Sequence, residues 1–189
     1  MFKKTLLAVI ATSFLSGAAC NVFAADAGHG QITFQGVVIT SPCSIVPGDE
    51  NQTIELGEVA DSALNGDKSS EPVDVNIRLQ DCTLSTGGTP ISKAQVTFSS
   101  ANADSETNIL KNMEEGNSGG ATNVGVRLLT TSGTNVVMDV PQEVNLVADN
   151  SYQVLNFKAR MEYVGLGKET APATAGNVKT DVRYVLAYN

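Results

Sequence analysis

The sequence predicts an all-β fold, a sandwich or barrel built from short strands. Runs with alternating apolar side chains recur along the chain, and clusters of Gly, Asn, Asp, Ser and Pro separate them. Helical periodicity is missing apart from one possible short turn at residues 58–66. Many short strands at this spacing are typical of sandwiches and barrels. The chain shows no domain boundary, internal repeat or low-complexity tract, so we expect one domain.

Residues 1–24 have the pattern of a secretory signal peptide. Two lysines precede an apolar run at residues 5–19, and the small residues of "VFA" precede Ala25. These features predict export and cleavage before Ala25. A lipoprotein signal ending at Cys20 is the alternative, but Gly17 stands where such a signal needs Leu.

The composition of the exported chain excludes several classes of partner. Loss of Lys3 and Lys4 leaves 10 of the 12 basic residues against 20 acidic ones. An acidic surface argues against nucleic acid and against anionic lipid as partners. Because no second apolar run reaches about 18 residues, we expect no membrane-spanning helix.

The predicted strands differ in the quality of their alternation. The best patterned are residues 73–79, 94–100, 123–130, 151–164 and 177–189. Shorter candidates are residues 54–56, 136–138 and 144–146. In the long run the apolar row begins at Val154 and continues from Phe157. This parity break between Leu155 and Phe157 predicts a bulge or bend there.

Two cysteines, Cys43 and Cys82, remain after removal of the signal. In an exported chain the simplest prediction is one disulfide between them, worth roughly 4 kcal/mol in the chain-entropy model. Two separate buried thiols are the alternative.

The sequence offers no recognisable catalytic or metal-binding set. His29 is the single histidine and cannot form a zinc site with the ligands this chain offers. Glu114 and Glu115 lie in a Gly-rich loop, where we expect solvated charges. Phosphate loops, nucleophile elbows and triads are absent from the sequence. We therefore predict neither an enzyme nor a cofactor.

Both ends of the exported chain carry strands with one apolar face. Near the start, "GQITFQGVVITSPC" places Ile32, Phe34, Gly36 and Val38 in one row. The terminal strand has its own apolar row, Val182, Tyr184, Leu186 and Tyr188. An edge strand this apolar must pair or it aggregates. The two ends either pair within one molecule, or the N-terminus of one subunit completes the next.

The whole exported chain resembles the pilins of type 1 and P pili, which the chaperone–usher pathway assembles. The resemblance is carried by seven segments in order: "FQGVVITSPC", "IELGEV", "VDVNIRLQDC", "VGVRLLTTSG", "LNFKARMEYVG", "APATAG" and "DVRYVLAYN". Each segment is weak alone, and their order and spacing make the match specific. The length fits a one-domain shaft subunit better than a two-domain tip adhesin.

The resemblance implies an incomplete immunoglobulin-like β-sandwich that lacks its last strand. Residues 25–40 would be a donor-strand extension and residues 41–189 the pilin domain. Gly30, Ile32, Phe34, Gly36 and Val38 would form the donor strand that fills a neighbour's groove. Chaperone–pilin complementation is itself an established example of strand addition.

The resemblance also implies partners and a place of action. A periplasmic chaperone would first fill the groove at Val182, Tyr184, Leu186 and Tyr188 and would bind the carboxylate of Asn189. At an outer-membrane usher the donor strand of the next subunit would then replace the chaperone. Repetition of this exchange would give a homopolymeric adhesive fimbrium on the cell surface. The disulfide of the family would correspond to Cys43 and Cys82.

Two other classes compete with this interpretation. A monomeric secreted sandwich that binds a carbohydrate or a protein would keep its N-terminal strand for itself, but the lack of Trp weakens a sugar-binding surface. A sortase-linked pilin would need a sorting motif and an apolar tail, whereas this chain ends in "YVLAYN".

Overall fold

The computed structural model describes residues 30–86, 89–164 and 171–189. It divides into two units, up to Val38 and from Ile39 to Asn189, and each is described by itself. The predicted signal peptide, residues 1–24, lies outside the described residues. No helix in the described parts is long and apolar enough to cross a membrane.

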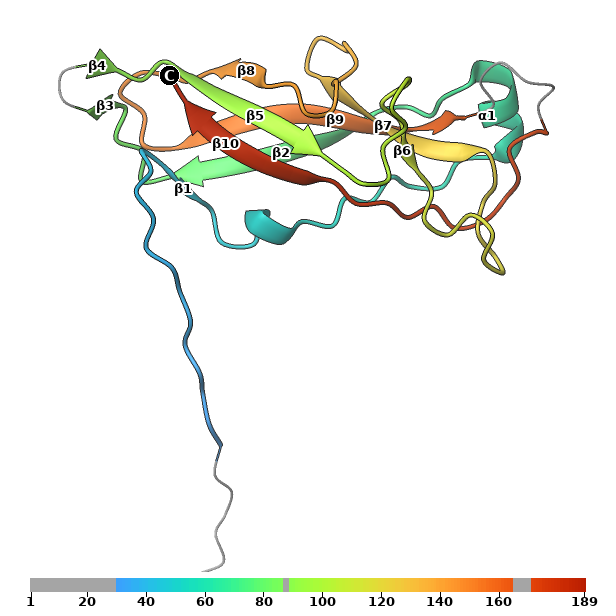
Figure 1. Cartoon of the computed structure of the whole chain (residues 1–189), viewed down its shortest axis with the longest axis horizontal. Coiled ribbons are helices and arrows are strands. Elements are labelled where there is room, and N and C mark those ends of the chain that lie inside the picture. Colours follow the sequence, from blue (N-terminus) through green and yellow to red (C-terminus); the bar gives the residue numbers. More distant parts are fainter. Residues whose placement is uncertain (1–29, 87–88, 165–170) are drawn as a thin grey trace, which may run out of the picture. The chain divides into compact units, whose positions relative to one another are not determined.

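The second unit is built almost entirely of antiparallel strands (Figure 1). In chain order its elements are β1 (Ser44–Ile45), the 3₁₀ helix η1 (Asp49–Asn51), α1 (Asp61–Asp67), β2 (Val73–Gln80), β3 (Ser85–Thr86), β4 (Thr89–Pro90), β5 (Lys93–Ser99), β6 (Leu110–Lys111), β7 (Val124–Thr130), β8 (Gln142–Asn145), β9 (Gln153–Tyr163) and β10 (Arg183–Tyr188). One sheet has the order β1-β2-β9-β7-β6 and the other β10-β5-β8, while β3 and β4 form a small hairpin. The predicted all-β class is confirmed.

The two larger sheets enclose one hydrophobic core. Side chains from both sheets belong to the same buried cluster, among them Ile77, Leu79, Val96, Phe98, Val126, Leu128, Leu155 and Phe157. Phe98 of β5 meets Phe157 of β9 edge to face, with ring centroids 4.9 Å apart. Aromatic pairs favour this geometry, because the positive edge of one ring faces the negative face of the other. The arrangement is a β-sandwich.

The predicted bulge in the long strand is wrong. β9 pairs with β2 without interruption, with Val154 opposite Arg78 and Leu155 opposite Ile77. Its buried row starts at Gln153, whereas Val154 is only partly buried. The amide of Gln153 is hydrogen-bonded to the β8–β9 loop, so a polar residue occupies the first inward position. The parity of the apolar residues alone was misleading.

Two of the short predicted strands do not form. Residues 54–56 are extended but pair with no strand in the described parts of the chain. In residues 136–138 the amide of Val136 donates to the Leu128 carbonyl and that of Met138 to the Asn108 side chain. Because its partners belong to different segments, this stretch has no single neighbour with which to build a ladder.

Strand β7 is buried on both faces, which makes Gly125 a close-packing position. A Cβ at Gly125 would lie 2.4 Å from Ile109 Cγ2 and 2.8 Å from the Leu110 carbonyl oxygen. The oxygen belongs to the neighbouring β6 ladder and cannot move aside without breaking it.

We therefore expect Gly125→Ala to lower the free energy of unfolding by about 1–3 kcal/mol, the range for an overpacked core. Urea unfolding of the purified subunit measures this change. Gly66→Ala is the matched control, since a Cβ there meets nothing within 4 Å and α1 favours Ala over Gly. Equal stability of Gly125→Ala and the parent chain would contradict the assignment.

Candidate functional site: an open groove beside the C-terminal strand

Strand β10 is paired along one edge only. It runs antiparallel to β5, from Arg183 opposite Ser99 to Tyr188 opposite Ala94. Among the described residues its other edge has no strand partner. Its inward row is partly buried and packs against the core, as the sequence predicted: Val182, Tyr184, Leu186 and Tyr188. The other edge of β10 therefore offers main-chain hydrogen-bonding groups to a further strand.

A large groove opens beside residues 174–182, the chain that leads into β10. Its volume is about 1150 Å³, and its two walls are residues 52–59 and residues 174–182. Core side chains line it, including Val75, Leu110, Val126, Leu128, Ala159 and Met161. The hydrophobic interior of the sandwich is thus open along one side.

The wall opposite residues 174–182 also has free main-chain groups. In the described structure, residues 53–59 form no main-chain hydrogen bond and belong to no strand. Ile54, Leu56 and Val59 are partly buried in this stretch, and the residues between them are exposed. Extended chain with apolar side chains turned inward and unpaired peptide groups is suited to pair with an inserted strand.

A second, smaller hollow of about 340 Å³ continues toward the end of β10. It lies between residues 39–43 with Ile45 and the side chains of Tyr184, Leu186 and Tyr188. Tyr184 donates a hydrogen bond of 2.8 Å from its hydroxyl to the Asp49 carbonyl oxygen. Burial raises the pKa of the Tyr184 and Tyr188 hydroxyls above the usual value.

The turn that receives the Tyr184 hydroxyl is held by a charged pair. Asp49 is 2% exposed and accepts bonds from the Arg78 main chain at 2.8 Å and from its Nε at 2.9 Å. These bonds from Arg78 lower the pKa of the Asp49 carboxyl below its usual value. The pair fixes η1 against β2 just before the groove wall begins.

The wall at residues 174–182 is held by a buried amide. Asn112 donates to the carbonyls of Ala121 and Asn177 at 2.8 and 2.9 Å. Its oxygen accepts the amides of Glu114 and Lys179 at 3.1 and 2.9 Å. All of its hydrogen-bonding positions are used, so Asn112 ties the wall firmly to the loop after β6.

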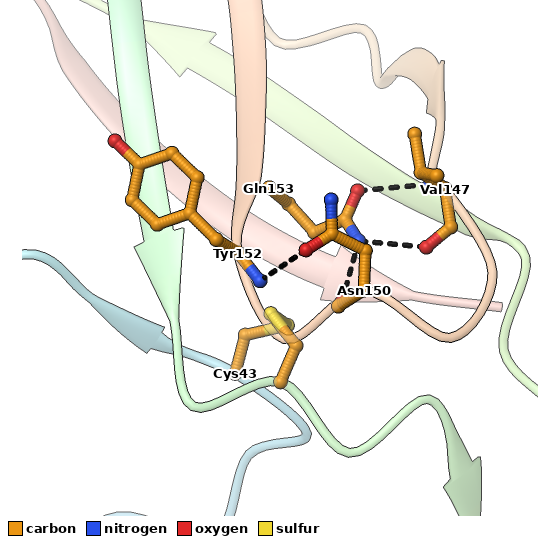
Figure 2. Close-up of a disulfide and its surroundings, with 6 residues drawn as sticks. Cys43, Val147, Asn150, Tyr152 and Gln153 are labelled. Carbon is orange, nitrogen blue, oxygen red and sulfur yellow. Dashed lines mark hydrogen bonds between the residues drawn. A yellow bond between two sulfur atoms is a disulfide. The ribbon is translucent and has the colours of Figure 1, made fainter.

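The disulfide joins Cys43, just before β1, to Cys82, just after β2, as predicted. Cys43 also lines the smaller hollow. Figure 2 shows the β8–β9 loop beside it, where the buried Gln153 side chain bonds to both main-chain groups of Val147 and to the Asn150 carbonyl. Because Cys82 lies just after β2, the disulfide anchors the Cys43 wall of the smaller hollow to the sheet that contains β2.

In the described part of the N-terminal unit, residues 30–38, there is no regular element. Its apolar side chains are exposed, with values of 78% at Ile32, 89% at Phe34 and 101% at Val38. A Cβ at Gly30 or Gly36 would meet nothing within 4 Å, and neither glycine has a left-handed backbone. Nothing in the described chain itself requires glycine at these two positions.

The C-terminal residue is partly engaged within the chain. The amides of Ser92 and Lys93 donate to the Asn189 carbonyl oxygen at 2.9 and 3.1 Å. The Asn189 amide in turn donates to the Lys93 carbonyl at 3.0 Å. These bonds hold the end of β10 against β5.

Several residues that form or hold the walls of the groove were not predicted from the sequence. The sequence analysis predicted no role for Asp49, and within the unpaired wall it predicted a strand at residues 54–56. Asn112 carried no local signal, because its partners are distant in sequence. Thr180 interrupts the apolar row before β10, and this interruption was the one signal that was available.

A sandwich whose interior is open beside an unpaired edge strand belongs to the class of subunits completed by a strand from a partner. Residues 32–189 match the sequence profile of the family described as Fimbrial protein. The chain is 48% identical to the uncharacterized fimbrial-like protein YgiL of Escherichia coli (strain K12), over 99% of this chain and 98% of that protein. It is 32% identical to the major MR/P fimbria protein of Proteus mirabilis (strain HI4320), over 98% and 99%. A chaperone–usher pilus structure that concerns rod uncoiling superposes with a TM-score of 0.69 at 23% identity, covering 86% of this chain and 97% of that chain.

The chain belongs to the fimbrial protein family. It is a structural subunit of a surface pilus, it polymerises with other fimbrial subunits, and the family is not enzymatic. The resemblance read from the sequence is confirmed, and so is the incomplete immunoglobulin-like sandwich.

Proposed function

We propose that residues 28–39 of one copy fill the groove of a second copy as a donor strand. Exchange of this strand from copy to copy builds the shaft of the fimbrium as a homopolymer. The observation that carries the proposal is the groove itself, because core side chains line it, the wall at residues 53–59 makes no main-chain hydrogen bond in the described structure, and β10, which follows the other wall, has one edge without a strand partner there. An inserted strand would bury that core and pair with β10.

The donor residues match this need in character. Ile32, Phe34 and Val38 are apolar, alternate along the chain and are exposed in the described structure. Burial of each side chain contributes about 1.5–3 kcal/mol. Gly36 lies in the same row, although no contact in the described structure of its own chain requires glycine at this position. This supports a role for Gly36 in close approach to the neighbour.

The order of events before assembly follows from the same groove. A subunit with an open core needs a temporary strand, which we assign to a periplasmic chaperone at Val182, Tyr184, Leu186 and Tyr188. An outer-membrane usher would then present the next donor strand. Asn189 would bind the chaperone through its carboxylate, and its bonds to Ser92 and Lys93 hold it beside the start of β5. In this scheme residues 1–24 are the signal, 25–40 the extension and 41–189 the pilin domain.

The proposal predicts that Gly36→Trp abolishes fibres while the subunit still folds with its chaperone. The indole would stand in the inward row of the donor strand, where close approach leaves no room. Electron microscopy of the cells and gel analysis of unheated fibres measure assembly, and chaperone pull-down measures folding.

Gln35→Trp is the matched control, because it places the same side chain on the opposite face of the strand. We expect it to assemble normally. Normal fibres from Gly36→Trp would refute the donor-strand assignment. A chain that stays monomeric even without substitution would point instead to a secreted binding module.

A further inference from the structure

One polar residue interrupts the inward row that leads into β10. Between the partly buried Val178 and Val182, which face the core, the same parity places Thr180. Its hydroxyl is inaccessible to water and has no hydrogen-bond partner among the described residues. Thr180 also lines the large groove.

The lone hydroxyl contrasts with the other buried polar side chains. Asp49, Asn112, Arg127 and Gln153 all have hydrogen-bond partners. A buried hydroxyl without a partner destabilises a fold by about 1–3 kcal/mol, although a hydroxyl can rotate to find an acceptor or donor. Either another molecule supplies a hydrogen-bond partner for the Thr180 hydroxyl, or the unpaired hydroxyl is a destabilising defect of the empty subunit.

The main chain on either side of Thr180 is already engaged. The Lys179 carbonyl accepts the Met113 amide at 2.8 Å, and the Lys179 amide donates to Asn112 at 2.9 Å. The Asp181 carbonyl accepts the Ser100 hydroxyl at 2.7 Å. These bonds hold the main chain of the wall in place. The Thr180 side chain is free to rotate about its own bonds and lines the groove, so a strand that enters the groove can supply the partner once the hydroxyl turns toward it.

We propose that the Thr180 hydroxyl binds a main-chain group of the strand that fills the groove. This inference rests on the proposed function and names a residue that distinguishes the filled groove from the empty one. A main-chain partner follows from the composition of the donor row, since Ile32, Phe34 and Val38 have no polar side-chain atoms and Gly36 has no side chain. Without a partner the hydroxyl destabilises the empty subunit. With a main-chain partner from the inserted strand it stabilises the filled subunit.

The test compares fibres of the wild-type chain with those of Thr180→Val and Thr180→Ser. Val has nearly the shape of Thr without the hydroxyl, and Ser retains the hydroxyl without the methyl. Fibres sheared from cells that express the full-length gene are placed in urea, and release of monomer is followed over time. We expect Thr180→Val fibres to dissociate about tenfold faster, the loss of roughly one hydrogen bond, and Thr180→Ser fibres to stay near the wild-type rate.

Unfolding of the same three chains as dilute monomers separates binding from folding. Thr180→Val should leave the monomer's urea midpoint unchanged or raise it, because an unpaired hydroxyl has been removed. Equal dissociation of Thr180→Val and wild-type fibres would overturn the proposal, and so would a lower midpoint of the Thr180→Val monomer. Folded Thr180→Val monomers that form no fibres would support it. Fibres from Gly36→Trp would refute the donor strand, whatever the Thr180 variants show.

Discussion

A chain that begins at Ser41 is expected to gain several kcal/mol of stability when residues 28–39 are attached after Asn189 through a flexible linker. The attached segment can then enter the groove of its own molecule. It buries Ile32, Phe34 and Val38 at about 1.5–3 kcal/mol each and pairs with the free edge of β10. Urea unfolding of the two chains, both with the disulfide formed, measures the difference.

A third chain, in which Ile32, Phe34 and Val38 of the attached segment are replaced by Ser, is the matched control. It keeps the linker and the main chain but has no apolar row, so its stability should stay near that of the chain without the segment. Light scattering must show that all three chains are monomeric. Equal and high stability of all three would mean that the sandwich is already complete, and a monomeric binding module would then be the better interpretation.

Replacing both Cys43 and Cys82 by Ala is expected to lower the free energy of unfolding by about 4 kcal/mol. The two cysteines are 39 residues apart, and the chain-entropy model gives this size for such a loop. This loss should be a large fraction of the subunit's total stability, because its core is open on one side. Cys43 also lines the smaller hollow, so we expect the double variant to be captured less by the chaperone.

Urea unfolding with and without a reducing agent checks the disulfide prediction. Reduction should bring the wild-type chain to the stability of the double variant and should leave the double variant unchanged. Full stability and unchanged chaperone capture in the double variant would show that the bond has no bracing role.

Local patterns in the sequence predicted the terminal strand well. The alternation of Tyr184, Leu186 and Tyr188 places them on the inward face of β10, and the structure confirms this row. The helical turn near residues 58–66 is present as α1, and Cys43 and Cys82 are joined. These features depend on side-chain periodicity or on a count of cysteines, which a single chain reveals.

Other features failed because they depend on distant partners. The bulge expected between Leu155 and Phe157 is missing, since the inward row of β9 begins with the polar Gln153. Residues 54–56 have strand-like side chains, but no strand in the described parts of the chain pairs with them. A strand is defined by its ladder, and the ladder involves residues far away in sequence.

The sequence by itself determined the all-β class, the apolar row of β10, the disulfide and the membership of a pilus-building family. It also showed an N-terminal segment with an alternating row of apolar side chains, Ile32, Phe34 and Val38, which is unusual in a solvent-exposed tail. Only the tertiary structure decided that β10 has a free edge, that core side chains line the groove beside it and that the Thr180 hydroxyl has no partner among the described residues. The reason is physical: alternation is a property of one strand, whereas an open groove depends on which strands pair around it.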